Sequence, residues 1–454
     1  MLRVTWVQPE DLVRHELRQA RQDGREPKVI AARWRAAGGS EEAPPGGAST
    51  QPASRYLRLL AEDLLDELAD LPSRLSEQEP TDLARIRRLC PDWPQASGRA
   101  PSPGHRGFEA AWLGRAAGCL LGKPVGTLPL DAIRRLARAT GNWPLNTWFT
   151  ARGVPEELLD EHPWNRRSAA TSLAENIDGM PEDDDLDYPL LNLLLLQRHG
   201  RAFTTTDVAR LWLDELPAGR TSTAERLAYR NLLVGIEPPH TARHRNPFRE
   251  WTGALTRADV HGWTNPGDPA AAAEQAHRDA VLTHTANGVY AAMFTAATIA
   301  AAATGTQDVH ACLRTGRSVV PPGSRLARAV DHAVELALTH EKFEDVVDEL
   351  HAVHSADHHR AHAIPNTALI AAALTHADGD FTGSVCRAVS GGWDTDSTGA
   401  TAGSVAGLLA GTPAALPERW TAPLKNRLAT SVADFDGTGF DTLAHLTHLE
   451  TTRP

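Results

Sequence analysis

Several features that would quickly place a chain in a known class are scarce in this sequence. Its 454 residues include only four cysteines, which are scattered and form no C-x-x-C pair. Such spacing argues against a disulfide framework or a zinc knuckle and is typical of reduced thiols in the cytosol. A G-x-x-x-x-G-K-[ST] loop and a G-x-S-x-G turn are also absent from the sequence. P-loop and α/β-hydrolase chemistry therefore have no support.

A basic excess is also missing, because 46 Lys and Arg face 57 Asp and Glu, for a net charge of −11. This balance predicts no nucleic-acid partner. Residues 1–6 lack the apolar run of a signal peptide, and we expect a cytoplasmic protein. Residues 280–307 carry no charged side chain and are long enough to span a bilayer. Their Ala- and Thr-rich composition instead predicts a buried helix and no membrane partner.

Apolar residues recur at helical spacing along most of the chain, and strand-like alternation is scarce. The sequence therefore predicts an all-α protein. Segments rich in Gly, Pro and Ser at 38–54 and 91–107 predict linkers, so residues 1–100 form a helical N-terminal extension and residues 105–454 the main domain. We expect helices over residues 10–21, 55–71, 108–121, 186–198, 207–216, 269–303, 325–340, 343–353, 365–376 and 397–409.

Two dense groups of short oxygen-bearing side chains each precede a predicted helix. One is Glu-Asp-Asp-Asp at 182–185, and the other is Gly-Gly-Trp-Asp-Thr-Asp-Ser-Thr-Gly at 391–399. Helix capping explains one acid in each group but not all of them. Carboxylates this close raise one another's pKa unless a cation lies between them. Hard divalent cations prefer oxygen ligands, so the two groups predict one shared metal site.

These motifs occur in the order seen in a known family. Residues 114–125 (GRAAGCLLGKPV), 181–185 (PEDDD), 279–284 (DAVLTH) and 391–403 resemble four signatures of the ADP-ribosylglycohydrolases. That family includes the dinitrogenase reductase-activating glycohydrolases and the protein ADP-ribosylhydrolases. The resemblance covers about residues 105–450, and it implies an all-α orthogonal helical bundle with a dinuclear metal cleft.

The resemblance also implies a set of site residues and a cofactor. The cofactor would be two Mg²⁺ ions, with Mn²⁺ as the alternative. The implied catalytic residues are Asp183 and Asp184, and the implied metal ligands are Glu182, Asp183, Asp184, Asp394, Asp396 and Ser397. The implied substrate-binding residues are His284, Trp393, Asn287 and Gly122. For Trp393, packing rather than stacking on a base or ribose is the alternative.

The implied reaction is Mg²⁺-dependent hydrolysis of a glycosidic bond to an ADP-ribosyl group or a related nucleotide-ribose. The partner would be an ADP-ribosylated protein or a small molecule that contains ADP-ribose. Two departures from the family pattern bear on this reaction: Cys119 stands where the pattern has Asp, and Gly126 where it often has Glu. They keep two alternatives open, an N-ribosidase acting on a NAD-derived or nucleoside metabolite, and a non-catalytic ADP-ribose-binding protein.

Five histidines gather between residues 351 and 362, and two pairs of them have i, i+4 spacing. On a helix this spacing places two imidazoles on one face, as in some zinc sites. The sequence offers no acid at the position expected of a zincin helix. A polar, solvated helix end in a histidine-rich chain is the interpretation we favour.

Overall fold

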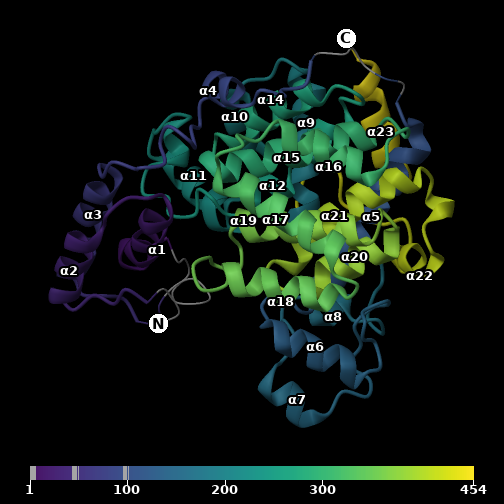
Figure 1. Ribbon diagram of the computed structural model, residues 1–454, viewed down its shortest axis with the longest axis horizontal. Helices are drawn as coiled ribbons and strands as arrows, with labels where there is room; N and C mark the ends of the chain where they lie inside the picture. The colour runs from purple at the N-terminus through teal and green to yellow at the C-terminus, as the bar shows by residue number, and fades with distance from the viewer. Residues whose placement is uncertain (1–6, 43–48, 50, 96–99, 101, 454) are drawn as a thin grey trace.

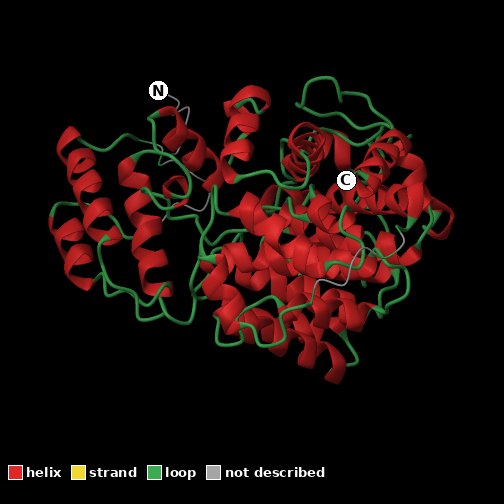
Figure 2. Ribbon diagram, turned by 90° about the horizontal axis from the view of Figure 1, so that it is seen from above, coloured by secondary structure: helices red, strands yellow, loops and turns green. Residues whose placement is uncertain are grey.

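The computed structural model describes residues 7–42, 49, 51–95, 100 and 102–453. Its regular elements in these ranges are helices, with two isolated β-bridges and no strand (Figure 2). The first α-helices are α1 (Pro9–Gln22), α2 (Lys28–Ala36), α3 (Arg55–Ala69), α4 (Leu83–Leu89), α5 (Gly104–Gly122), α6 (Leu130–Ala139), α7 (Glu156–Glu161), α8 (Ala169–Ser172), α9 (Asp184–His199), α10 (Thr205–Glu215), α11 (Thr223–Leu233), α12 (Gly253–Thr256) and α13 (Asp259–Trp263). These are followed by α14 (Pro269–Ala280), α15 (Ala286–Ala302), α16 (Val309–Ser318), α17 (Arg325–Thr339), α18 (Phe343–His354), α19 (Ala363–His376), α20 (Phe381–Ser390), α21 (Thr395–Ala410), α22 (Glu418–Thr421) and α23 (Phe440–Thr452).

Helices α5 and α21 lie side by side at the centre of the main domain (Figure 1). Small residues make this possible: a Cβ on Gly118 would overlap the carbonyl oxygen of Gly399, and Gly114 meets Gly403 in the same way. Without side chains between them, the two backbones pack in direct contact. Both helices are buried nearly all round. Their relative position is therefore set by main-chain atoms.

The N-terminal extension packs on the main domain through its own apolar cluster. The Leu stripe of α3, including Leu64 and Leu68, is buried together with Trp34, Phe248 and Trp251. Beside this cluster, Glu16 of α1 forms ion pairs with Arg249 and Arg25. The packing therefore covers this Leu stripe of the extension. The predicted linkers at 38–54 and 91–107 lie partly outside the described residues, as do residues 1–6.

The helices predicted from periodicity are present with ends shifted by a few residues, apart from the one expected over 269–303. The structure corrects that expectation: α14 ends at Ala280 and α15 begins at Ala286. The chain turns here because the Thr285 amide donates to the Arg249 carbonyl, and Ala286 has a positive φ of 41°. Several helices of the main domain, such as α6, α11 and α20, were not predicted from the periodicity.

Burial and covalent state agree with two further expectations. Residues 287–302 of α15 are buried, which confirms the interpretation of the uncharged segment as a core helix. Among the described residues, none of the helices is long and apolar enough to cross a bilayer. All four cysteines are free and buried.

Candidate functional site

The two acidic groups meet beside the C-terminal end of α5. Asp183 is the N-cap of α9, and its carboxylate accepts a hydrogen bond from the Asp185 amide at 2.9 Å. Asp394 is the N-cap of α21. The Ser397 hydroxyl donates to Asp185 Oδ1 at 3.2 Å and so joins one group to the other. The predicted convergence of the two motifs is therefore present, although 212 residues separate these partners.

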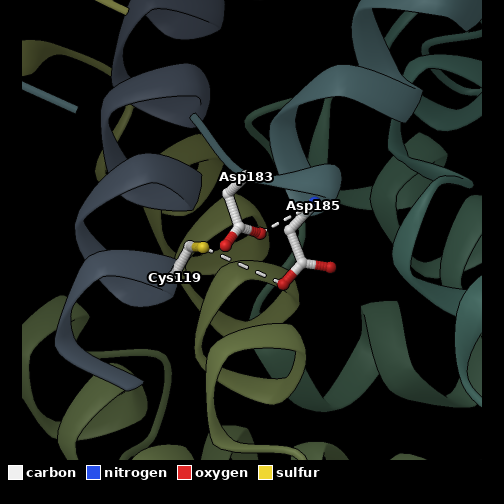
Figure 3. A group of neighbouring side chains, drawn as sticks. All are labelled: Cys119, Asp183 and Asp185. Carbon is white, nitrogen blue, oxygen red and sulfur yellow. Dashed lines mark hydrogen bonds between the residues drawn. The ribbon is translucent and has the colours of Figure 1, made fainter. Parts of the chain in front are cut away.

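In the first half of the site, the side chains of Cys119, Asp183 and Asp185 lie close together (Figure 3), and all three are buried. Cys119 of α5 lies with its thiol 3.8 Å from Asp185 Oδ2. The Lys123 ammonium forms an ion pair with Asp183 and donates to the Glu182 carbonyl at 3.2 Å. Within the described part of the chain, Cys119, Asp183 and Asp185 are the one group of at least three His, Cys, Asp or Glu residues whose ligand atoms lie within 4.8 Å of one another.

The turn before α9 is held by a buried arginine. The guanidinium of Arg115, which has no exposed surface, donates from Nε to the Asp185 carbonyl at 2.7 Å. Its Nη1 pairs with Asp259 at 2.9 Å. Because both ends of this contact are buried, the orientation of the acidic turn is fixed by a charge-assisted hydrogen bond.

Glu182 and Asp184 point to the outside of the same turn. Glu182 pairs with Arg220 at 2.8 Å, and the Ser222 hydroxyl donates to Asp184 Oδ2 at 3.3 Å. The Asp184 side chain is exposed. A cavity of about 420 Å³ lies beside the start of the turn, where Pro181 and Glu182 line it.

The second half of the site centres on Asp394 and Asp396. The Thr252 hydroxyl donates to Asp394 Oδ2 at 2.6 Å, and Arg360 Nη1 lies 3.5 Å from Asp394 Oδ1. Asp396 accepts from the Ser397 amide at 3.1 Å. A Cβ on Gly126 would lie 3.5 Å from Asp396 Oδ2, so the position of the missing family glutamate faces this carboxylate.

Crowding governs the pKa values of these carboxyl groups. Burial, with the charges of Asp183 and Asp396, raises the pKa of Asp185 well above its usual range. Burial, with the charges of Asp394 and Asp183, raises the pKa of Asp396 to about 7. Burial also opposes ionisation of Asp183, but the Lys123 ammonium outweighs it and lowers the pKa of that carboxyl. The cluster therefore holds more negative charge than its own cations neutralise.

Asp184 belongs to the same electrostatic group. Enclosure by the cluster, together with the charges of Asp183 and Asp396, raises its pKa well above the usual range. Because the side chain itself is exposed, the neighbouring charges are the dominant physical cause.

The donor set fits a hard divalent cation. Carboxylate oxygens are the ligands that Mg²⁺ and Mn²⁺ prefer, and Mg²⁺ needs only one or two of them besides water. Positive charge at this place would lower the raised pKa values of Asp184 and Asp396. Three of the predicted ligands, Glu182, Asp183 and Asp394, already have a cationic partner, which is Arg220, Lys123 or Arg360 respectively.

The structure places His284 in a buried layer behind the carboxylates. Its Nδ1 lies 2.5 Å from the Thr283 hydroxyl and 3.9 Å from Glu225 Oε1. Glu225 in turn pairs with Arg257 at 2.9 Å. Burial and the Arg257 charge lower the pKa of His284 well below its ordinary value, so the imidazole is neutral.

Asn287 belongs to another network, between the extension and the main domain. Its amide nitrogen donates to Glu79 at 2.8 Å and to Glu250 at 2.9 Å, and its carbonyl accepts from the Leu326 amide. Arg325 pairs with both glutamates. Every polar atom of the Asn287 side chain is thereby engaged within the protein.

Gly122 and Trp393 border the acidic site through packing. The Gly122 carbonyl accepts from the Thr395 hydroxyl at 2.8 Å where α5 meets α21. Trp393, at a positive φ of 60°, stacks on His351 with ring centroids 4.1 Å apart. For Trp393 this arrangement corresponds to the packing alternative. The roles in substrate binding that the sequence predicts for both residues stay predictions.

The histidine segment forms ring contacts. His358 packs edge-on against His354 and His362, and His359 stacks on Trp251 at 4.1 Å. Within the described residues, none of these imidazoles belongs to a group of three metal-ligand side chains. The structure corrects the interpretation of a polar, solvated helix end, because the imidazoles of His354 and His362 are buried.

Three contributors to the site were missed by the sequence reasoning. Lys123, Thr252 and Arg360 contact Asp183 or Asp394 from segments that carry no acidic motif. Lys123 lies in the glycine-rich signature, next to Gly122, and its charge in an apolar run is the signal that could have drawn attention to it.

The described chain is thus an all-α protein with an oxygen-rich acidic site built between two helix N-termini. Its residues 102–452 match the family model of the ADP-ribosylglycohydrolases. Because this match spans more than half of the chain, the protein belongs to the ADP-ribosylglycohydrolase family, a family of hydrolases.

Comparison of structures finds a chain of an ADP-ribosylglycohydrolase-related protein complex. The two are 20% identical in sequence, and the match covers 77% of this chain and 99% of the other, with a TM-score of 0.47. Among curated proteins, no sequence matches this chain.

Proposed function

We propose that the protein hydrolyses a glycosidic bond to an ADP-ribosyl group, or to a related nucleotide-ribose, with the help of Mg²⁺. The observation that supports this most directly is the convergence of the two acidic groups, joined by Ser397 and Asp185. Asp183, Asp184, Asp394, Asp396 and Ser397 would form the metal and substrate site. When bound there, a divalent cation supplies positive charge for ribose hydroxyls and water.

Within this site, Asp184 is our candidate for the general base. It is exposed, its pKa is raised, and its one hydrogen bond among the described contacts comes from the Ser222 hydroxyl. A base needs free lone pairs within reach of water. Asp183 is instead held by Lys123 and by the Asp185 amide. Its proposed role is to orient the turn that carries Asp184.

A substrate panel tests the proposal. Full-length protein is incubated with arginine- and serine-linked ADP-ribosyl peptides, NAD and simple ribosides, each with Mg²⁺ or with a chelator, and products are identified by mass spectrometry. We expect Mg²⁺-dependent release of ADP-ribose from at least one peptide. Asp184→Asn and Asp394→Asn should lower turnover at least about 100-fold, the usual loss when a positioned acid or base is removed.

The matched control is Asp331→Asn, which changes an exposed aspartate that pairs with Arg317. It should turn over substrate normally, and all variants should keep their helical circular dichroism. Full activity of both site variants would refute the assignment of these residues. Turnover of NAD or a riboside alone would favour the N-ribosidase alternative. ADP-ribose binding without any turnover would indicate a binding protein.

A further inference from the structure

The Lys123 side chain is a cation built into the acidic site. It leaves the main chain directly after the last residue of α5, and 9% of it is exposed. Its ammonium contacts the Asp183 carboxylate and the Glu182 carbonyl. The backbone at this point is fixed, because the Ser168 hydroxyl donates to the Lys123 carbonyl at 2.8 Å.

This ammonium lies at the edge of the tightest ligand group in the described chain. Asp183 belongs both to the ion pair with Lys123 and to the group that it forms with Cys119 and Asp185. A divalent ion in that group would share the Asp183 carboxylate with the ammonium. Two cations on one carboxylate repel each other strongly in a poorly solvated place.

The other members of the group offer little to offset this repulsion. Cys119 offers a thiol sulfur, which is a soft ligand and suits Mg²⁺ poorly. Both Asp185 oxygens already interact within the protein, one with Ser397 and one with Cys119.

Other carboxylates of the site remain open to an ion. Asp184 is exposed, and Asp396 accepts one described hydrogen bond, from the Ser397 amide. Arg360 lies 3.5 Å from Asp394, but 39% of its side chain is exposed and its charge is screened by water. Asp184 and Asp396 therefore keep carboxylate oxygens free for an ion, whereas the Asp183 carboxylate is already paired with the Lys123 ammonium.

We propose that the Lys123 ammonium takes the place of one of the two divalent cations, so that the protein binds a single ion, on the side of Asp184, Asp394 and Asp396. This inference rests on the proposed metal dependence. It changes the two-ion site implied by the sequence resemblance into a site with one exchangeable ion and one permanent side-chain cation.

The test is the number of Mn²⁺ ions bound by the full-length, chelator-stripped protein. The EPR signal of free Mn²⁺ is followed during titration of the wild type and Lys123→Met, which removes the charge and keeps much of the length. Lys425→Met is the matched control, because it removes the same charge from an exposed pair with Asp178. We expect one bound ion for the wild type and Lys425→Met, and two for Lys123→Met.

Two ions, or none, on the wild type would overturn the inference, and so would an unchanged count of one on folded Lys123→Met. If Lys123→Met does not fold, the wild-type count still decides, and Lys123→Arg should also bind one ion. Turnover is a separate readout. One bound ion without hydrolysis of any substrate would contradict the proposed function alone, and hydrolysis with two bound ions would contradict this inference alone.

Discussion

The Lys123 ammonium and the Asp183 carboxylate form an ion pair in which each side chain is 9% exposed. Removing one partner of such a pair leaves the other charged and poorly solvated. We predict that Lys123→Met lowers the free energy of unfolding by about 3–5 kcal/mol at pH 7. Urea unfolding measures the change, and the exposed-pair variant Lys425→Met should lose less than about 1 kcal/mol.

The same pair gives this prediction a pH dependence. The pKa of Asp183 is lowered in the folded protein, after Lys123 overcomes the effect of burial. Its stabilising contribution is therefore present above the ordinary carboxyl pKa and is lost as the pH falls through the folded-state value. The difference between wild type and Lys123→Met should shrink in acid. A difference that stays constant down to pH 3 would contradict the ion-pair explanation.

Ionisation of Asp396 should lower the stability of the folded protein, whereas ionisation of Asp183 raises it. Its pKa rises from 3.8 to about 7 on folding, through burial and the charges of Asp394 and Asp183. The folded protein then holds a proton that the unfolded chain has lost, so this group reduces stability as the pH rises from about 4 to 7. In chelator, Asp396→Asn should gain stability over the wild type across that window and level off above it.

Denaturant midpoints at several pH values measure this gain. Addition of Mg²⁺ is the control, because a cation at the site would stabilise the ionised carboxylate and reverse the order of the two proteins. Parallel curves for wild type and Asp396→Asn in chelator would show that Asp396 is not crowded by its neighbours.

His15 links the stability of the extension to pH. It lies edge-on to Phe248 and Trp251 of the main domain, and burial, with the charges of Arg18 and Arg14, lowers its pKa to about 4. Below pH 6.5, His15 binds a proton in the unfolded chain but stays neutral in the folded protein. The free energy of unfolding therefore falls as the pH drops toward 4.

From pH 6.5 to 5 this single group accounts for a loss of up to about 2 kcal/mol. His15→Phe keeps a ring at the interface and should lose correspondingly less on acidification. The exposed His240→Phe serves as the comparison and should follow the wild type. Identical acid sensitivity of His15→Phe and wild type would exclude His15 as a source.

A methyl group at the helix contact should be poorly tolerated. A Cβ on Gly118 would overlap the backbone of Gly399, whereas one on Gly323 would meet nothing within 4 Å. We predict a loss of at least about 2 kcal/mol for Gly118→Ala, because backbone cannot move aside as a side chain does. Gly323→Ala should be nearly neutral. The affinity for Mn²⁺ should also fall in Gly118→Ala, since the shift separates the two acidic turns.

The sequence was sufficient for the helical class, because helical periodicity is a local signal. The convergence of the two acidic motifs was predicted from their chemistry, since two groups of oxygen ligands suit one shared cation. The Lys123–Asp183 pair joins residues 60 positions apart, and nothing near Lys123 points to its partner. The break at 281–285 was missed for a similar reason. It depends on the carbonyl of Arg249, which lies in a loop well upstream.

His284 and Asn287 occur in or near a segment that resembles a family signature, and their side chains are buried in separate hydrogen-bond networks. Their roles in substrate binding stay predictions. A signature indicates that a segment is similar, but the contacts of each side chain depend on the fold. Lys123, from an equally familiar segment, contacts Asp183 of the acidic site.

The direct backbone contact between α5 and α21 also limits how the protein can diversify. Main-chain contacts at Gly114, Gly118 and Gly122 set the spacing between the two acidic turns. A change of side-chain rotamer cannot alter this spacing. New substrate preferences must then arise outside this contact, in the connecting loops around the site, such as the loop that carries Arg360. The loops around the site can therefore vary in sequence while the contact between α5 and α21, which positions the acidic turns, stays the same.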